Sequence, residues 1–203
     1  MPRPAELLRF TRAERWVHRC TAVLMVCCLL TAAILYIGPL SVLVGRRALV
    51  VWVHVLAGLA LPVPILLGWA SAAFRADLRE LNRFRPADRD WLRSRGRRPG
   101  RFPTGKFNAG QKLYAAFVAG AILVQLGTGV LMRYGQHWPL SLRIGATFVH
   151  DWLAAAVLAA VLGHLHFALR DADARLGMRT GRVPAAWASR EHPGWAEQPD
   201  RPR

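Results

Sequence analysis

Four uncharged apolar runs limit what this chain can fold into. Each run approaches or exceeds the roughly 20 residues that a helix needs to cross the hydrocarbon core of a bilayer. The runs are Cys20–Gly38, Ala48–Phe74, Leu113–Met132 and Trp152–Leu169. Because 53% of the residues are hydrophobic although 20% are charged, the two kinds are segregated along the chain. The pattern predicts an all-α integral membrane protein, a four-transmembrane-helix bundle.

The expected domain organisation follows from these runs. We predict a single membrane domain over residues 1–203. Its parts are helices at about 16–38, 48–74, 113–133 and 147–169, a basic cytoplasmic loop at 75–112 and a cytoplasmic tail at 170–203.

The positive charge predicts how the chain is oriented in the membrane. The formal net charge is +16, which in a soluble protein would point towards nucleic acid. Here the N-terminal arm, the middle loop and the tail carry 5, 12 and 7 of the 28 lysines and arginines, and the two short loops carry 2 each. By the positive-inside rule both termini and the middle loop are cytoplasmic. We therefore expect a multi-pass membrane protein, in contact with lipid and not with nucleic acid.

Two histidines lie on one face of the fourth span. The segment Thr147–Leu169 reads TFVHDWLAAAVLAAVLGHLHFAL, and its His150 and His164 are fourteen residues apart. On a helix they are about 40° from eclipsed and roughly 21 Å apart along the axis. Imidazole is a common axial ligand of haem iron, and polar groups inside a membrane are usually functional. The spacing therefore suggests two stacked metal or haem centres.

The first two spans supply one more histidine each. RWVHRC places His18 at the inner end of the first span, and VWVHVLAG places His54 at the outer end of the second. The alternating direction of the spans pairs His54 with His150 at the outer depth, and His18 with His164 at the inner depth. Each pair joins two helices, as needed to clamp a planar haem between opposed imidazoles. The alternative is four interfacial histidines that hydrogen-bond to neighbouring helices.

The remaining histidines are weaker candidates. His166 turns roughly 200° away from His164, so it is the less favoured alternative as inner ligand. His137 lies in an outer loop, and we expect it to face water. We expect the same of His192 in the tail.

The prolines and cysteines of the apolar runs do not predict a binding site. Pro62 and Pro64 should kink the second span, because proline removes a backbone donor. Cys20, Cys27 and Cys28 are odd in number and have no metal-binding spacing. We expect small buried thiols and no disulfide framework.

The middle loop ends in a polar motif. The loop is rich in arginine, and we expect it to be solvated on anionic lipid, with a protein docking site as the alternative. The motif KFNAGQK, residues 106–112, comes directly before the third span. Asn108 with Gly110 would start a helix. The functional alternative is a polar pocket at the membrane surface that offers donors to a quinone carbonyl.

These residues carry a resemblance to a known family. The chain resembles the cytochrome b, or gamma, subunit of membrane-bound formate dehydrogenases, within the wider group of four-helix di-haem b-type cytochromes that also serves hydrogenases. The resemblance runs from about Arg12 to Trp195. Its most specific pieces are KFNAGQK, the paired histidines of the fourth span and the tail GRVPAAWASREHPGW. Two departures are Ala154, where a glycine is expected, and His166, where the family often has an aromatic residue.

The resemblance implies cofactors, a substrate and partners. The two histidine pairs would ligate two haems b, and Asn108, Gly110 and Gln111 would line a quinone pocket with His164 beside the inner haem. The quinone would be menaquinone or ubiquinone. The partners would be an iron–sulfur beta subunit, which delivers electrons to the outer haem, and a periplasmic molybdenum or tungsten catalytic alpha subunit. The resemblance also implies a bacterial inner membrane, and a higher oligomer of that heterotrimer is compatible with the family.

The expected function is electron transfer across the membrane. The chain would be the quinone-reducing subunit of a formate dehydrogenase complex and would not itself oxidise formate, since no catalytic constellation appears in it. One rival is a cytochrome b subunit of a hydrogenase or other periplasmic oxidoreductase, or a stand-alone cytochrome. A non-redox rival is a haem-free membrane anchor or transporter. Family analogy alone supplies the formate substrate.

Overall fold

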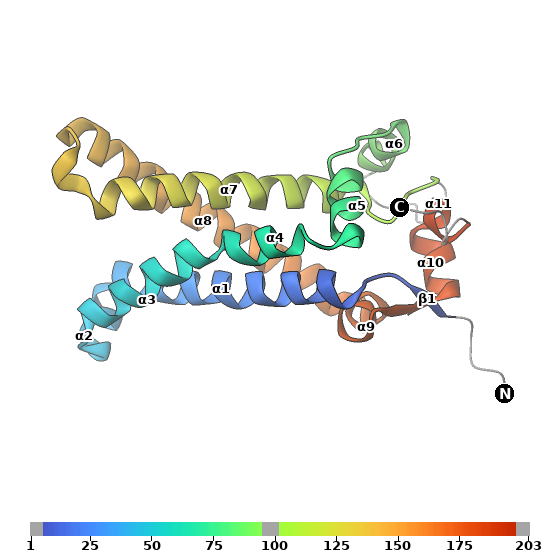
Figure 1. The fold of residues 1–203 in the computed structure, drawn as a ribbon, viewed down its shortest axis with the longest axis horizontal. Coiled ribbons are helices and arrows are strands. Elements are labelled where there is room, and N and C mark those ends of the chain that lie inside the picture. Colours follow the sequence, from blue (N-terminus) through green and yellow to red (C-terminus); the bar gives the residue numbers. More distant parts are fainter. Residues whose placement is uncertain (1–5, 95–101, 198–203) are drawn as a thin grey trace. The chain divides into compact units, whose positions relative to one another are not determined.

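The computed structural model describes residues 6–94 and 102–197, which are largely helical (Figure 1). The elements in chain order are β1 (Glu6–Leu8), α1 (Arg12–Tyr36), α2 (Gly38–Val44), α3 (Arg47–Ala60), α4 (Pro62–Gly68), α5 (Ala72–Leu81), α6 (Pro86–Arg93), α7 (Ala109–Arg133), the 3-10 helix η1 (Gly135–His137), α8 (Leu140–Arg170), α9 (Ala172–Thr180), β2 (Arg182–Pro184), α10 (Ala185–Glu191) and α11 (Pro193–Ala196).

The predicted membrane fold is confirmed. Among the described residues, four helical segments are long and apolar enough to cross a bilayer: Arg12–Tyr36, Arg47–Gly68, Ala109–Arg133 and Leu140–Arg170. Most of their apolar side chains are exposed, as expected of helices whose surroundings are lipid. The chain is an all-α multi-pass membrane protein.

The second span is interrupted at its first proline. Helix α3 ends one residue before Leu61, whose N–H bonds a carbonyl only three residues back at 3.3 Å, and α4 begins at Pro62. The expected kink is therefore a short break between two helices. The span ends at Gly68, six residues before the expected boundary, because Ser71 caps the separate helix α5.

The described chain divides into two compact units. The helical unit consists of residues 17–67 and 118–162. The polar unit consists of the described residues up to 16, from 68 to 117 and from 163 onward. The expectation of one membrane domain over the whole chain stays a prediction.

All four spans contribute to the core of the helical unit. Its buried residues are Met25 of α1, Leu61 at the break, Ala121 and Ile122 of α7 and Val157 of α8. A small side chain such as that of Ala121 lets helices approach closely, which is the main source of packing energy between helices in lipid. This packing holds α3 and α8, the helices that carry His54 and His150.

The core of the polar unit is made largely by the tail. Strand β1 pairs antiparallel with β2, with Leu7 opposite Val183. Val183 packs with Trp187 and Trp195 in a buried cluster. The Trp187 indole donates from Nε1 to the Asp171 carboxylate at 3.1 Å, so this large aromatic ring is buried with its polar atom bonded. The tail motif is thus a folded element with its own core.

Two glycines of the tail allow close approach to other segments. Gly181 ends α9 with φ of 93°, and a Cβ there would lie 2.5 Å from the Phe10 carbonyl oxygen. A Cβ at Gly194 would lie 2.7 Å from the Pro103 carbonyl oxygen. Any larger side chain at either position would push the N-terminal arm or the middle loop away from the tail.

Candidate functional site

The structure brings His54 and His150 together in the helical unit. His54 projects from α3 and His150 from α8, and their ring centroids are 6.2 Å apart with the planes inclined at 65°. Two imidazoles on opposite sides of one metal have ring centres roughly 6 Å apart, since a metal–nitrogen bond is about 2 Å and the nitrogen lies about 1 Å from the ring centre. The separation therefore matches that of two ligands sharing one ion.

The surroundings of this pair also fit a planar group. On α7, a Cβ at Gly129 would lie 3.4 Å from His150 Cε1, so the imidazole packs against bare backbone. A Cβ at Gly58 or Gly127 would meet no atom within 4 Å. Gln125 donates from Nε2 to the His150 carbonyl at 3.1 Å. The described residues thus fit haem, whose iron is commonly held by histidine nitrogens.

Hydroxyl groups from the other two spans contact the same imidazoles. Thr31 Oγ1 of α1 lies 2.8 Å from His54 Nδ1. Thr128 Oγ1 of α7 lies 2.9 Å from His150 Nδ1. Both contacts use Nδ1, so Nε2 is the nitrogen that each ring can offer to a metal.

The other predicted ligands lie in different units. His18 belongs to the helical unit and His164 to the polar unit, so their pairing stays a prediction. In the polar unit the Tyr114 ring stacks on the His164 imidazole, with centroids 4.9 Å apart and planes inclined at 14°. His166 instead makes an edge contact with Phe167 at 5.5 Å. The two neighbouring histidines of α8 therefore have different surroundings.

The motif KFNAGQK begins α7 with a reciprocal cap. Asn108 Oδ1 accepts from the Gln111 backbone N–H at 2.9 Å, and Gln111 Oε1 accepts from the Asn108 N–H at 3.0 Å. This arrangement satisfies two backbone donors that a helix start leaves unpaired. The intervening Gly110 lies against Trp91, since a Cβ there would be 3.1 Å from the indole. The motif is a helix start, and the cap leaves the Asn108 amide nitrogen as a donor.

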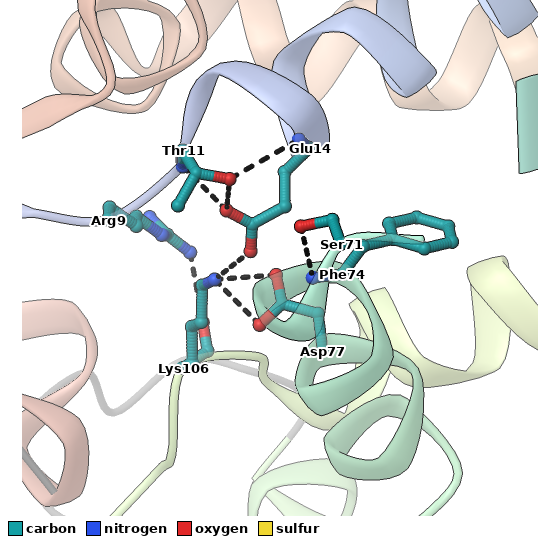
Figure 2. A network of polar contacts seen from close by, with 7 residues as sticks. All are labelled: Arg9, Thr11, Glu14, Ser71, Phe74, Asp77 and Lys106. Atoms are coloured by element: carbon teal, nitrogen blue, oxygen red, sulfur yellow. Dashed lines mark hydrogen bonds and ion pairs between the residues drawn. The ribbon is translucent and has the colours of Figure 1, made fainter. Parts of the chain in front are cut away.

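Lys106 of the same motif is the centre of a buried ionic cluster. Its Nζ donates to Glu14 Oε1 at 2.8 Å and to the two Asp77 oxygens at 2.7 and 2.5 Å (Figure 2). All three side chains are at most 8% exposed. Arg9 donates to the Lys106 carbonyl at 3.1 Å, and Thr11 donates to Glu14 through both its N–H and its hydroxyl. The cluster ties the start of α1 to α5 and to the segment before α7.

Burial sets the electrostatics of this cluster. Burial and the neighbouring Glu14 carboxylate raise the pKa of Asp77 to about 7, against the opposing effect of Lys106. Burial lowers the pKa of Lys106, against the opposing effects of Asp77 and Glu14. Each charged group is therefore tolerated in this position only because its partners are present.

The expectation of a solvated, arginine-rich loop is wrong for two of its acidic residues, Asp77 and Asp88. A second buried lysine, Lys112, donates to Asp88 Oδ2 at 2.8 Å and to the Arg83 carbonyl at 2.9 Å. Asp77 and Asp88 are each less than 10% exposed. The physical reason is ion pairing, because a buried aspartate is tolerated when a buried lysine lies beside it. The arginine-rich sequence does not indicate which of its charged residues pair in this way.

The expectation that His192 faces water is also wrong. His192 is 2% exposed and donates from Nδ1 to the Gly105 carbonyl at 2.8 Å, while its Nε2 lies 3.0 Å from Arg9 Nη2. Because a guanidinium can only donate, Nε2 accepts and the ring is neutral. Burial and the positive charge of Arg9 lower the pKa of His192 to about 3.

We expect this histidine to make the polar unit acid-sensitive. Its pKa in the folded chain lies below the unfolded value of 6.5, so its stabilising effect is present above pH 6.5 and is lost as the pH falls towards 3. In that window each pH unit should cost up to about 1.4 kcal/mol. The measurement is thermal unfolding in detergent between pH 7 and 4.5, followed by tryptophan fluorescence.

The matched variant is His192→Asn, which keeps a donor for the Gly105 carbonyl and cannot titrate. The variant should be less stable at pH 7 and show a shallower loss of stability towards pH 4.5. Parallel pH profiles of the two proteins would contradict the assignment.

Sequence reasoning missed three residues that contact the predicted ligands. Thr31 and Thr128 carry no signal of their own, because threonine is ordinary in membrane helices and often bonds its own helix backbone. Tyr114 could have been found, since it follows Gly110 by four residues and so shares its helical face. Gly110 and Tyr114 therefore lie on one face of α7, and Tyr114 of that face contacts His164 of α8.

Four apolar helices and a facing pair of imidazoles are the architecture of a membrane cytochrome b. The chain belongs to the prokaryotic cytochrome b561 family, whose model matches residues 9–177. It is accordingly a multi-pass bacterial membrane protein of electron transfer with haem b as its cofactor.

Individual relatives agree with the resemblance predicted from sequence. The cytochrome b556(Fdn) subunit of the nitrate-inducible formate dehydrogenase of Escherichia coli (strain K12) is 31% identical over 94 residues, which cover 45% of this chain and 43% of the relative. The formate dehydrogenase cytochrome b556 subunit of Haemophilus influenzae is 32% identical over 96 residues, covering 45% and 40%. The match thus spans less than half the length of these curated relatives.

Proposed function

We propose that this chain is the di-haem membrane subunit of a formate dehydrogenase complex. It would carry electrons from a periplasmic iron–sulfur subunit, itself served by a molybdenum or tungsten catalytic subunit, to quinone near the cytoplasmic side. Both termini would be cytoplasmic. The proposal is supported by the family, by the relatives named above and by the distribution of lysine and arginine.

The observation that carries the proposal is the facing pair of His54 and His150. Their centroid separation of 6.2 Å suits two axial ligands, and they project from different helices of one packed unit. Haem b held by these two side chains would supply reversible one-electron transfer. The role of these two side chains is to hold and orient that group.

A second haem position would use His18 and His164. On α8, His164 lies fourteen residues beyond His150, which corresponds to roughly 21 Å along the helix. Tyr114 stacks on the His164 ring and restricts its rotation. The two α8 histidines would thus hold groups at two depths of the membrane, as required for transfer across it.

The quinone would bind beside the start of α7. Asn108 offers the amide nitrogen that its helix cap does not use, and Gly110 and Gln111 would line the pocket beside it. Tyr114, one turn further along the same face, reaches His164. Quinone carbonyls need hydrogen-bond donors, and the Asn108 amide would supply one.

The test uses the chain purified in detergent together with whatever subunits accompany it. We expect about two haems b per chain by pyridine haemochrome, reduction of both by formate when two larger subunits co-purify, and reoxidation by added quinone. Haem reduced by hydrogen and not by formate would point to a hydrogenase partner. A protein without a Soret band would overturn the redox function.

The variant Asn108→Asp separates the quinone role from the helix cap. Aspartate keeps the capping oxygen, so the apparent melting temperature should stay near that of the wild type. The lost amide donor and the added negative charge should slow reoxidation of haem by quinone about tenfold or more. The check is stopped-flow spectroscopy of formate-reduced or dithionite-reduced protein.

The companion variant Asn108→Ala removes both functions. It should also lose about 1 kcal/mol of stability, because the cap is gone. Wild-type quinone kinetics in both variants would remove Asn108 from the pocket.

A further inference from the structure

Two threonines make the same contact with the two facing histidines. Thr31 Oγ1 lies 2.8 Å from His54 Nδ1, and Thr128 Oγ1 lies 2.9 Å from His150 Nδ1. The threonines come from α1 and α7, the two spans that carry neither histidine of this pair. Because both contacts join a threonine hydroxyl to a histidine Nδ1, the two threonines are expected to have the same role.

The hydroxyl hydrogen of Thr31 is already used within its own helix. Thr31 Oγ1 donates to the carbonyl of Cys27 at 2.7 Å, with that of Cys28 at 3.0 Å. A hydroxyl has one hydrogen and two lone pairs. The Thr31 oxygen therefore accepts from the His54 ring, and the ring nitrogen that donates is Nδ1–H.

Thr128 is engaged in the same way. Its Oγ1 lies 2.8 Å from the Val124 carbonyl and 3.2 Å from the Gln125 carbonyl, so its hydrogen also points into its own helix. Its oxygen is left to accept from His150 Nδ1–H. Both imidazoles are thereby held as the tautomer whose Nε2 is unprotonated.

We propose that Thr31 and Thr128 are positioning residues that fix this tautomer and ring orientation, so that His54 and His150 both present Nε2 to one haem iron. The inference rests on the proposed haem ligation by this pair. On the His150 side, Gly129 also lets the imidazole lie against the backbone of α7.

The hydrogen bond from Nδ1 also changes the ligand electronically. An imidazole that donates from Nδ1 is a stronger electron donor through Nε2, and groups of this kind commonly change metal affinity by about 10–100-fold. A stronger donor ligand favours ferric over ferrous iron. Loss of either threonine hydroxyl should therefore raise the midpoint potential of the haem that His54 and His150 hold.

The experiment compares Thr31→Val and Thr128→Val with the matching serine variants in the full chain. Valine keeps the shape and removes the hydroxyl, whereas serine keeps the hydroxyl. The control is Thr147→Val, because the Thr147 hydroxyl donates to the Arg143 carbonyl of its own helix at 3.0 Å. Readouts are potentiometric titration, electron paramagnetic resonance of the low-spin ferric haems and the rate of haem loss to apomyoglobin.

We expect each valine variant to raise the potential of one haem, to shift its g values and to lose haem about tenfold faster. The serine variants and Thr147→Val should behave like the wild type. Unchanged potentials and g values in both valine variants would overturn the inference. So would valine-like behaviour of the serine variants, since the hydroxyl would then not be the cause.

A wrong assignment of His54 and His150 as haem ligands would give a different experimental result from a wrong assignment of the threonines. If His54→Ala and His150→Ala keep their full haem content, the ligand assignment is wrong. If these histidine variants lose haem while the threonine variants are silent, the ligation stands and only the positioning role fails.

Discussion

Replacing Lys106 by methionine should lower the free energy of unfolding by about 3–5 kcal/mol, because it leaves two buried carboxylates without their cation. Glu14 and Asp77 both bond the Lys106 ammonium at 2.8 Å or less, and both carboxylates are buried. The measurement is chemical or thermal unfolding in detergent at pH 7.5. The loss should shrink towards pH 5, since burial favours protonation of the unpaired carboxylates.

A double-mutant cycle tests the cause of this loss. Adding Asp77→Asn to Lys106→Met should recover part of the stability, whereas Asp77→Asn alone should be destabilising. The control Arg93→Met removes an exposed cation that lies 3.6 Å from Asp90, and should change stability by less than about 0.5 kcal/mol. Additive effects of the two cluster substitutions would mean that their charges are not coupled.

Replacing His54 or His150 by alanine should remove about half of the haem, because each haem needs both of its axial imidazoles to stay bound. Either substitution breaks the same pair, so pyridine haemochrome should fall from about two to about one haem per chain in both variants. The double variant should lose no more than the single ones.

The controls for this prediction are other histidines of the same chain. His137 and His166 are both exposed in the described structure, and His166 makes an edge contact with the neighbouring Phe167. Alanine at either position should leave the haem content unchanged. Loss of both haems in His54→Ala, or haem loss in His137→Ala, would contradict the assignment of the pair.

The membrane fold was predictable because its signal is local. A run of apolar residues is sufficient to indicate a span, and Pro62 is sufficient to indicate a break, whatever the rest of the chain does. The end of the second span at Gly68 was not predictable from hydrophobicity, since it depends on Ser71 starting a new helix. Hydrophobic runs therefore set the number of spans better than their ends.

The polar unit was not predictable because its contacts are distant in sequence. His192 is buried by Arg9 and by the Gly105 carbonyl, and Lys106 is buried by Glu14 and Asp77. From the sequence alone, each of these polar residues would be predicted to be exposed to solvent. The resemblance to a family pointed to the tail and to KFNAGQK, but the structure gives the physical reasons for their residues.

The candidate site was partly predictable for the same reason. Alternating direction of the spans is enough to pair His54 with His150, and the structure brings these side chains together. The contacts of Thr31 and Thr128 require the packing of four helices, which no single segment specifies. Tyr114 needed only the helical period and the choice of Gly110 as a reference point.

Pairing of the first strand with the tail has a consequence for the timing of biogenesis. Arg9 and His192 are separated by 183 positions, and β1 cannot pair before β2 has been made. At 5–20 residues per second this delay is roughly 10–40 s, and the first three spans are complete well before it ends. During that interval Glu6–Leu8 is an unpaired strand edge on a nascent chain. The polar unit can therefore complete its fold only after the ribosome has made the tail.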